Sequence, residues 1–130
     1  DSHGLMIITN DGKITNKIIH PSKKIDKIYI VKVDKKLTAY QEKNFMDGVK
    51  LSQKEITSDA KISLIDKEKI TYKVTIHQGY NRQIRRMFEY FKIKVLDLKR
   101  IKIGQICLDD LKDGDYKKLS KKEVEYLESL

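Results

Sequence analysis

Two neighbouring segments of this 130-residue chain alternate apolar and polar side chains, and this pattern constrains the fold more than any other feature. Apolar residues occupy every second position in residues 60–64 and again in residues 70–76. Alternation with a period of two is typical of β-strands that bury one face and expose the other. The polar residues Asp66, Lys67 and Glu68 lie between the two segments and predict a hairpin in an antiparallel sheet. The apolar positions are Ala60, Ile62, Leu64, Ile70, Tyr72, Val74 and Ile76.

Three further segments are expected to be strands. The short apolar run at residues 4–10 predicts a buried strand. Residues 27–33, with the sequence KIYIVKV, are apolar on both alternating faces except for their lysines, which indicates a central strand. The last predicted strand covers residues 94–102.

Local signals also predict four helices. Two of them start at capping boxes, in which the first and fourth residues satisfy each other's backbone amides. The helices are a short one after Asp11-Gly12 that Pro21 has to end, one from Thr38-Ala-Tyr-Gln41 to near Gly48, one with Asn81 as its N-cap, and one after Ser120-Lys-Lys-Glu123. Together the elements predict one α+β domain over residues 1–130, with helices packed on a mostly antiparallel sheet.

The charge of the chain favours a polyanionic partner. Lys and Arg total 28 against 19 Asp and Glu, so the net charge is +9, which suits nucleic acid or an anionic membrane surface. No apolar run approaches the ~18 residues of a membrane span, and no signal peptide opens the sequence. The single cysteine, Cys107, and three scattered histidines predict neither an internal disulfide nor a metal site. We therefore expect a reduced cytoplasmic protein that uses no metal.

The arginines are concentrated at one place. Only four basic residues are arginines, and three of them fall in residues 82–86. At about 100° per residue, the helix expected there carries an apolar stripe, with the arginines within roughly 100° of arc on the opposite side. One interpretation is an amphipathic helix with a solvated basic face. The stripe contains Ile84, Met87, Phe88 and Phe91, and the arginines are Arg82, Arg85 and Arg86.

A functional interpretation of these arginines has two arguments in its favour. The helix dipole disfavours each exposed cation near a helix N-terminus by roughly 0.3–1 kcal/mol. Lysine would solvate equally well, whereas the planar guanidinium adds bidentate hydrogen bonding and stacking. The segment therefore predicts an anion site, either for phosphate or for a carboxylate of the protein itself.

Tyr29 and the lysines around it form a second candidate region. Tyr29 is either a core residue of its strand or a flat ring that covers a base or another substrate. Lys23, Lys24 and Lys27 precede or begin this strand and predict a basic rim that could contact phosphates.

Five sequence strings resemble one family in the same order along the chain. They are DSHGLMIITNDG, DKIYIVKV, GYNRQIRRMFEYF, LKRIKIG and LKDGDYKKLSKKEVEYL. Together they resemble the catalytic domain of bacterial ribosomal pseudouridine synthases of the RsuA type. The DSHGL opening is most similar to the large-subunit RluF/RluB branch.

The resemblance implies a metal-free and cofactor-free isomerisation of a specific uridine in ribosomal RNA, by a protein expected to be a monomer. An aspartate carboxylate attacks a flipped-out uridine, the glycosidic bond breaks, the base rotates, and it is rejoined through carbon 5. By motif position, Tyr29 matches the tyrosine that covers the base, and Arg85 matches the arginine that pairs with the aspartate. The RNA contacts implied beside them are Arg82, Arg86, Asn81, Gln83 and Lys27.

The start of the chain departs from the family signature, which has Gly-Arg-Leu-Asp, two variable residues, Ser or Thr, one residue, and Gly. Ser2 and Gly4 fill the last two conserved positions, so the catalytic aspartate is expected two positions before Asp1, and Asp1 itself is not its match. We also expect the RNA-binding S4 domain usual in the family to lie outside this sequence. The resemblance thus predicts the C-terminal portion of a longer enzyme, inactive alone. Lys117 stands where the family often has Arg.

Two alternatives from other functional classes remain open. One is a non-catalytic RNA-binding module that uses the same basic face, and the other is a basic structural protein of the ribosome. The sequence also leaves open which uridine is the target and whether the substrate is ribosomal or transfer RNA, with 23S ribosomal RNA favoured.

Overall fold

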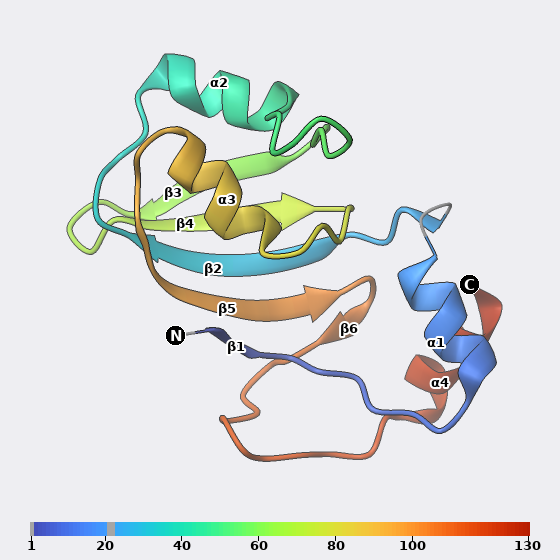
Figure 1. Cartoon of the computed structure of the whole chain (residues 1–130). Helices are drawn as coiled ribbons and strands as arrows, with labels where there is room; N and C mark the ends of the chain where they lie inside the picture. Colours follow the sequence, from blue (N-terminus) through green and yellow to red (C-terminus); the bar gives the residue numbers. More distant parts are fainter. Residues whose placement is uncertain (1, 21–22) are drawn as a thin grey trace.

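The sheet is centred on the predicted central strand. Figure 1 shows the computed structural model of the chain, which describes residues 2–20 and 23–130. The strand order is β1-β5-β2-β4-β3, with β6 paired to the end of β5. Both neighbours of β2 run antiparallel to it, and among the strands of the described residues only the β1–β5 pair is parallel. The strands are β1 (Ser2–Gly4), β2 (Lys27–Val33), β3 (Lys61–Asp66), β4 (Thr71–Ile76), β5 (Val95–Ile103) and β6 (Ile106–Cys107).

The β3–β4 hairpin confirms the alternation in the sequence. The turn is closed by Asp66, whose Oδ1 accepts hydrogen bonds from the backbone N–H groups of Glu68 and Lys69, both at 3.0 Å. Tyr72 and Val74 have no exposed surface, whereas Lys73 between them is exposed. The period of two therefore identifies the buried face correctly.

The helices form two groups, and each covers its own apolar cluster. Figure 1 shows α2 and α3 over one face of the sheet, while α1 and α4 lie side by side beyond the β6 end. Phe45 of α2 and Phe88 of α3 pack at 4.9 Å between ring centroids in the larger cluster. The smaller cluster joins Leu5, Ile103 and Leu127. The helices are α1 (Gly12–Ile19), α2 (Ala39–Asp47), α3 (Gln83–Tyr90) and α4 (Lys121–Ser129).

These elements confirm the predicted α+β class and most of the predicted helix starts. Asp11 caps α1, and both capping boxes form, at Thr38 for α2 and at Ser120 for α4. The helix α1 ends at Ile19, ahead of Pro21, which lies outside the described residues. Among the described residues, none of the helices has the length and apolar content needed to cross a bilayer.

The strand expected at residues 4–10 is wrong in extent. The strand β1 ends at Gly4, and the next residues leave the sheet with Met6 72% and Ile8 85% exposed. Gly4 has a φ of +113°, and a Cβ there would lie 2.3 Å from the carbonyl oxygen of Arg100. This close approach and unusual backbone angle turn the chain away from β5, so an apolar run does not continue as a strand.

The N-terminus of α3 also differs from expectation. The helix begins at Gln83, and its N-cap is Arg82 in a left-handed conformation with φ 52°, rather than Asn81. A turn precedes it, because the Gln83 N–H donates to the Tyr80 carbonyl at 3.0 Å. The Gln83 side chain in turn accepts from the Tyr80 N–H at 3.2 Å. These contacts favour the left-handed residue over an asparagine cap, which local sequence alone had favoured.

Candidate functional site

A pocket of about 300 Å³ opens between the start of α3 and the strands β1, β2 and β5. It brings together five of the seven residues that the sequence singled out, although they lie far apart in the chain. These are Lys27, Tyr29, Arg82, Gln83 and Arg85. Asn81 and Arg86 do not line it. Asp1, singled out as an acid that is not the expected nucleophile, lies outside the described residues.

Arg85 is the buried cation of this pocket. Arg85 is only 5% exposed, and its Nη2 donates a 2.6 Å hydrogen bond to Ser2 Oγ of β1. A buried guanidinium needs hydrogen-bonding partners, since an uncompensated charge is costly away from water. The interpretation as a solvated basic face therefore does not hold for Arg85, because its guanidinium is buried and bonded to Ser2. The anion-site interpretation fits this burial better.

Tyr29 faces two environments at once. It packs against the larger apolar cluster and also lines the pocket. Its backbone is paired with Val74 on one side and with Arg100 on the other. The two interpretations left open by the sequence, a core tyrosine and a ring facing a substrate, are therefore compatible.

Lys27 and Arg100 add two cations to the pocket wall. Lys27 Nζ donates to the Gln78 carbonyl at 3.4 Å, and Arg100 Nε donates to the Leu5 carbonyl at 2.9 Å. Burial lowers the pKa of the Lys27 ammonium, and the nearby Arg100 lowers it further. Sequence reasoning missed Arg100, the one arginine outside the cluster. The pairing of residues 27–33 with 94–102 could have found it, because that register places it beside Tyr29.

Gln83 acts within the protein rather than at its surface. It is 3% exposed, and its Nε2 donates to Gln78 Oε1 at 3.0 Å while its Oε1 accepts from Tyr80 N–H. Gln78 in turn donates to Ser58 Oγ at 3.1 Å. Gln83 thus links the start of α3 to the loop before it and to residue 58.

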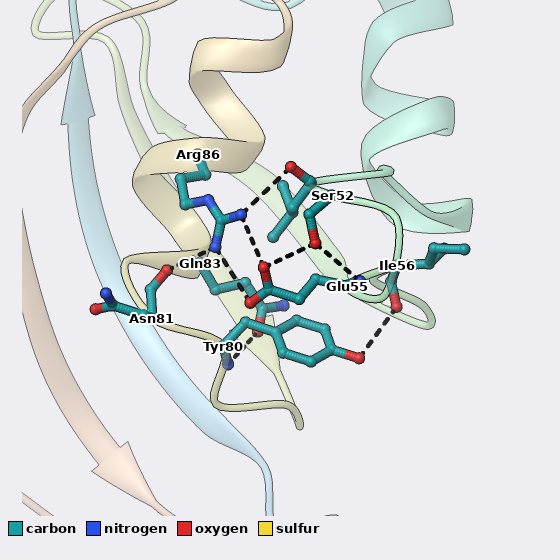
Figure 2. Close-up of polar contacts among 8 residues, drawn as sticks. Ser52, Glu55, Ile56, Tyr80, Asn81, Gln83 and Arg86 are labelled. Atoms are coloured by element: carbon teal, nitrogen blue, oxygen red, sulfur yellow. Dashed lines mark hydrogen bonds and ion pairs between the residues drawn. The ribbon is translucent and has the colours of Figure 1, made fainter.

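Arg86 binds a carboxylate of the protein itself, which was one of the two alternatives for the anion site. Its Nη2 lies 3.0 Å from Glu55 Oε1, and its Nη1 lies 3.3 Å from Glu55 Oε2 (Figure 2). Nη1 also donates to the Asn81 carbonyl at 3.0 Å, and Nη2 to the Leu51 carbonyl at 3.3 Å. The Glu55 pKa is lowered by the hydrogen bond from Arg86 and then by that from Ser52.

A larger pocket of about 770 Å³ adjoins the first. The two share Lys27, Gln78, Gly79, Tyr80 and Arg100, so these residues form the boundary between them. Its other walls are mainly apolar, and no sequence pattern had indicated it. They include Met6, Ile7, Ile18, Ile19, Ile25, Ile56 and Ile103.

His3 lies between two carboxylates and contacts both of them. Its Nε2 lies 3.1 Å from Asp97, and its Nδ1 lies 3.1 Å from Asp113. The hydrogen bond to Asp97, followed by that to Asp113, raises the pKa of the His3 imidazole. Within the described part of the chain, no group of three or more His, Cys, Asp or Glu side chains could hold a metal ion.

Comparison with known proteins identifies similar enzymes. A family model described as RNA pseudouridylate synthase matches residues 1–90. The chain is 39% identical, over 100% of its length, to ribosomal large subunit pseudouridine synthase B of Bacillus subtilis. It is 35% identical, over 95% of its length, to ribosomal small subunit pseudouridine synthase A of Vibrio cholerae. It covers 54% of each of these two proteins, so it spans about half the length of its curated relatives.

A solved structure agrees with these sequence matches. The chain superposes on a crystal structure of a pseudouridylate synthase with a TM-score of 0.84 and 32% identity. The match covers 92% of this chain and 52% of the other.

Proposed function

Because the chain belongs to the RNA pseudouridylate synthase family, we propose that the protein isomerises a uridine to pseudouridine in ribosomal RNA. The observation that carries this proposal is the burial of Arg85 in a pocket that Tyr29 also lines. Arg85 is suited to hold a reactive carboxylate, and Tyr29 is suited to cover a base.

In this proposal Arg85 holds the nucleophilic aspartate ionised and oriented. Its guanidinium bonds to Ser2, so it lies at the start of β1. The family signature expects the aspartate three residues before Ser2, a separation of at most about 10 Å in extended chain. A nearby guanidinium favours the ionised carboxylate, which is the form that acts as a nucleophile.

Tyr29 and the pocket cations would receive the substrate. A uridine must leave its base stack to expose its reacting atoms, at a cost of a few kcal/mol. Stacking on Tyr29 would recover roughly 1–3 kcal/mol of that cost. Lys27, Arg82 and Arg100 supply positive charge around the pocket for the flanking phosphates.

We propose large-subunit ribosomal RNA as the substrate. The support is the 39% identity with a large-subunit synthase over the entire chain, compared with 35% for a small-subunit synthase. It also rests on the DSHGL opening, which resembles the large-subunit branch.

Tritium release tests both statements. The full-length protein is incubated with unmodified 23S or 16S ribosomal RNA labelled with tritium at uridine carbon 5, which loses its hydrogen when the new carbon–carbon bond forms. Release from 23S RNA alone is the expected result. Release from 16S RNA alone would contradict the large-subunit assignment, and no release from either RNA despite tight binding would favour a non-catalytic binding module.

A further inference from the structure

The structure assigns Arg86 a positioning role: through Glu55 it fixes residues 51–56 and the turn before α3, and so places Tyr80 and Arg82 at the two pockets. Its effect on catalysis rests on the proposed function. The resemblance to the family implied instead that Arg86 contacts RNA. Three sets of contacts within the protein support the positioning role.

The guanidinium of Arg86 is bound by groups of the protein itself. Arg86 makes two bonds to the Glu55 carboxylate and one each to the carbonyls of Leu51 and Asn81 (Figure 2). These contacts engage both terminal nitrogens in the paired geometry that distinguishes arginine from lysine. An RNA phosphate would have to compete with a carboxylate that is already in place.

Glu55 belongs to residues 51–56, a segment with hydrogen bonds of its own. Ser52 Oγ donates to Glu55 Oε1 at 2.9 Å, and Glu55 N–H donates back to Ser52 Oγ at 3.2 Å. The next residue, Ile56, accepts a 3.5 Å hydrogen bond from the Tyr80 hydroxyl and lines the larger pocket. Glu55 therefore connects α3 to one wall of that pocket.

Arg86 also contacts the turn before α3. Arg82 has a left-handed backbone, which is strained for a residue with a side chain and persists only where its surroundings impose it. The Arg86 side chain helps to impose it, because its Nη1 donates to the Asn81 carbonyl at 3.0 Å, next to the ordinary helical hydrogen bond from the Arg86 N–H to the Arg82 carbonyl. This conformation carries Arg82 into the wall of the smaller pocket, while Tyr80 lines both pockets.

One substitution at Glu55, which lines neither pocket, distinguishes the phosphate-binding role of Arg86 from the positioning role. If Arg86 bound phosphate, Glu55→Gln would release it and strengthen RNA binding. If Arg86 is a positioning residue, Glu55→Gln should lower kcat in the same direction as Arg86→Gln, by roughly tenfold to a hundredfold for a misplaced site. The matched control is Glu68→Gln, which removes the same charge from the exposed β3–β4 turn.

The first experiment needs no activity. Amide hydrogen exchange in the full-length protein should become faster at residues 51–56 and 80–82 in both Glu55→Gln and Arg86→Gln, and stay unchanged in Glu68→Gln. Unchanged exchange at both segments in the two variants would overturn the proposal, whether or not the protein is an isomerase.

The second experiment measures turnover and RNA binding. The reversed pair, Glu55→Arg with Arg86→Glu, should recover part of the kcat lost in each single variant. Arg86→Gln should leave the slope of log affinity against log salt unchanged, whereas losing one phosphate contact would reduce it by about 0.9. A reduced slope, or tighter RNA binding in Glu55→Gln than in Glu68→Gln, would overturn the positioning role. If wild type lacks activity, the proposed function fails while the exchange experiment still decides this inference.

Discussion

Arg85 of α3 donates a 2.6 Å hydrogen bond to Ser2 of β1, across 83 positions of sequence. This contact joins the arginine cluster to the strand that carries the last two conserved positions of the family signature. It buries a cation that helix periodicity alone would have allowed on a solvated face. Arginine suits this buried position because its planar guanidinium carries several donors in a fixed geometry, which a mobile ammonium lacks.

Replacing Arg85 with lysine should nearly abolish turnover with little loss of RNA affinity. Lysine keeps the charge but cannot reproduce the planar, two-nitrogen donor geometry at a buried position. Tritium release and filter binding with the full-length protein measure the two quantities. Arg82→Lys, at an exposed position, is the comparison and should lose far less turnover. Equal losses of turnover and affinity for Arg85→Lys would show that Arg85 only contacts phosphate.

Tyr29→Ala should reduce kcat/KM by an amount equivalent to about 1–3 kcal/mol, the contribution expected from one stacked base. Tyr29→Phe keeps the ring and should retain most of the binding, so that its remaining defect reports on the hydroxyl. Tyr116→Ala serves as the control because Tyr116 is 92% exposed and lines neither pocket. An alanine variant as active as wild type would assign Tyr29 to the core alone.

Lys27→Met should weaken RNA binding while maintaining or raising the free energy of unfolding. Burial, with Arg100 nearby, lowers the Lys27 pKa below its ordinary value of 10.5, so the charged form is disfavoured in the folded state. This cost is present in full at neutral pH and is relieved only as pH rises towards 10.5. Urea denaturation measures stability, and the salt dependence of RNA affinity should lose about 0.9 in slope. The exposed Lys118→Met is the control. A destabilised Lys27→Met with normal RNA binding would contradict this prediction.

The His3 bridge should make stability depend on pH. Hydrogen bonds to Asp97 and Asp113 raise the His3 pKa above 6.5, so the folded state binds this proton more tightly than the unfolded chain. Its contribution is present in full below pH 6.5 and is lost as pH rises through the raised value. Urea denaturation across this range should show a loss of stability that His3→Gln removes and His77→Gln retains. An identical pH dependence in wild type and His3→Gln would refute the assignment.

Gly4→Ala should destabilise the protein severely. Backbone strain at a positive φ contributes about 1–3 kcal/mol, and overpacking contributes about 1–3 kcal/mol more. The new Cβ would lie 2.3 Å from the Arg100 carbonyl oxygen, which is backbone and cannot move aside easily. Gly12→Ala is the control, since a Cβ there meets nothing within 4 Å. Thermal or urea denaturation compares the two, and equal stability would mean that β1 does not pack against β5 as described.

Most of the regular structure could be predicted because its causes are local. The alternation at residues 60–76 identified both strands and their buried face, and the capping boxes identified the starts of α2 and α4. Two local predictions failed, one because of distant backbone and one because of a turn closed by contacts among residues 80–86. Gly4 ends its strand against Arg100, and Arg82 replaces Asn81 as the cap in a turn held by Arg86.

The candidate site divides in the same way. The motifs and the arginine cluster singled out Tyr29 and Arg85, and both line the smaller pocket. They could not reveal Arg100 or the larger pocket, because these depend on strand register and on how α1 packs beside the sheet. The motifs assigned Arg85 to the aspartate and Arg86 to RNA, but they could not reveal the partners that the structure shows, Ser2 for Arg85 and Glu55 for Arg86.

The sequence by itself determined most of the strands and helices, because periodicity and capping act over a few residues. It also determined that arginine, rather than lysine, is concentrated at one helix start. Only the tertiary structure decided the partner of each arginine. A helical arc specifies which side chains point the same way, whereas the surface that meets them comes from segments 31 and 83 positions away.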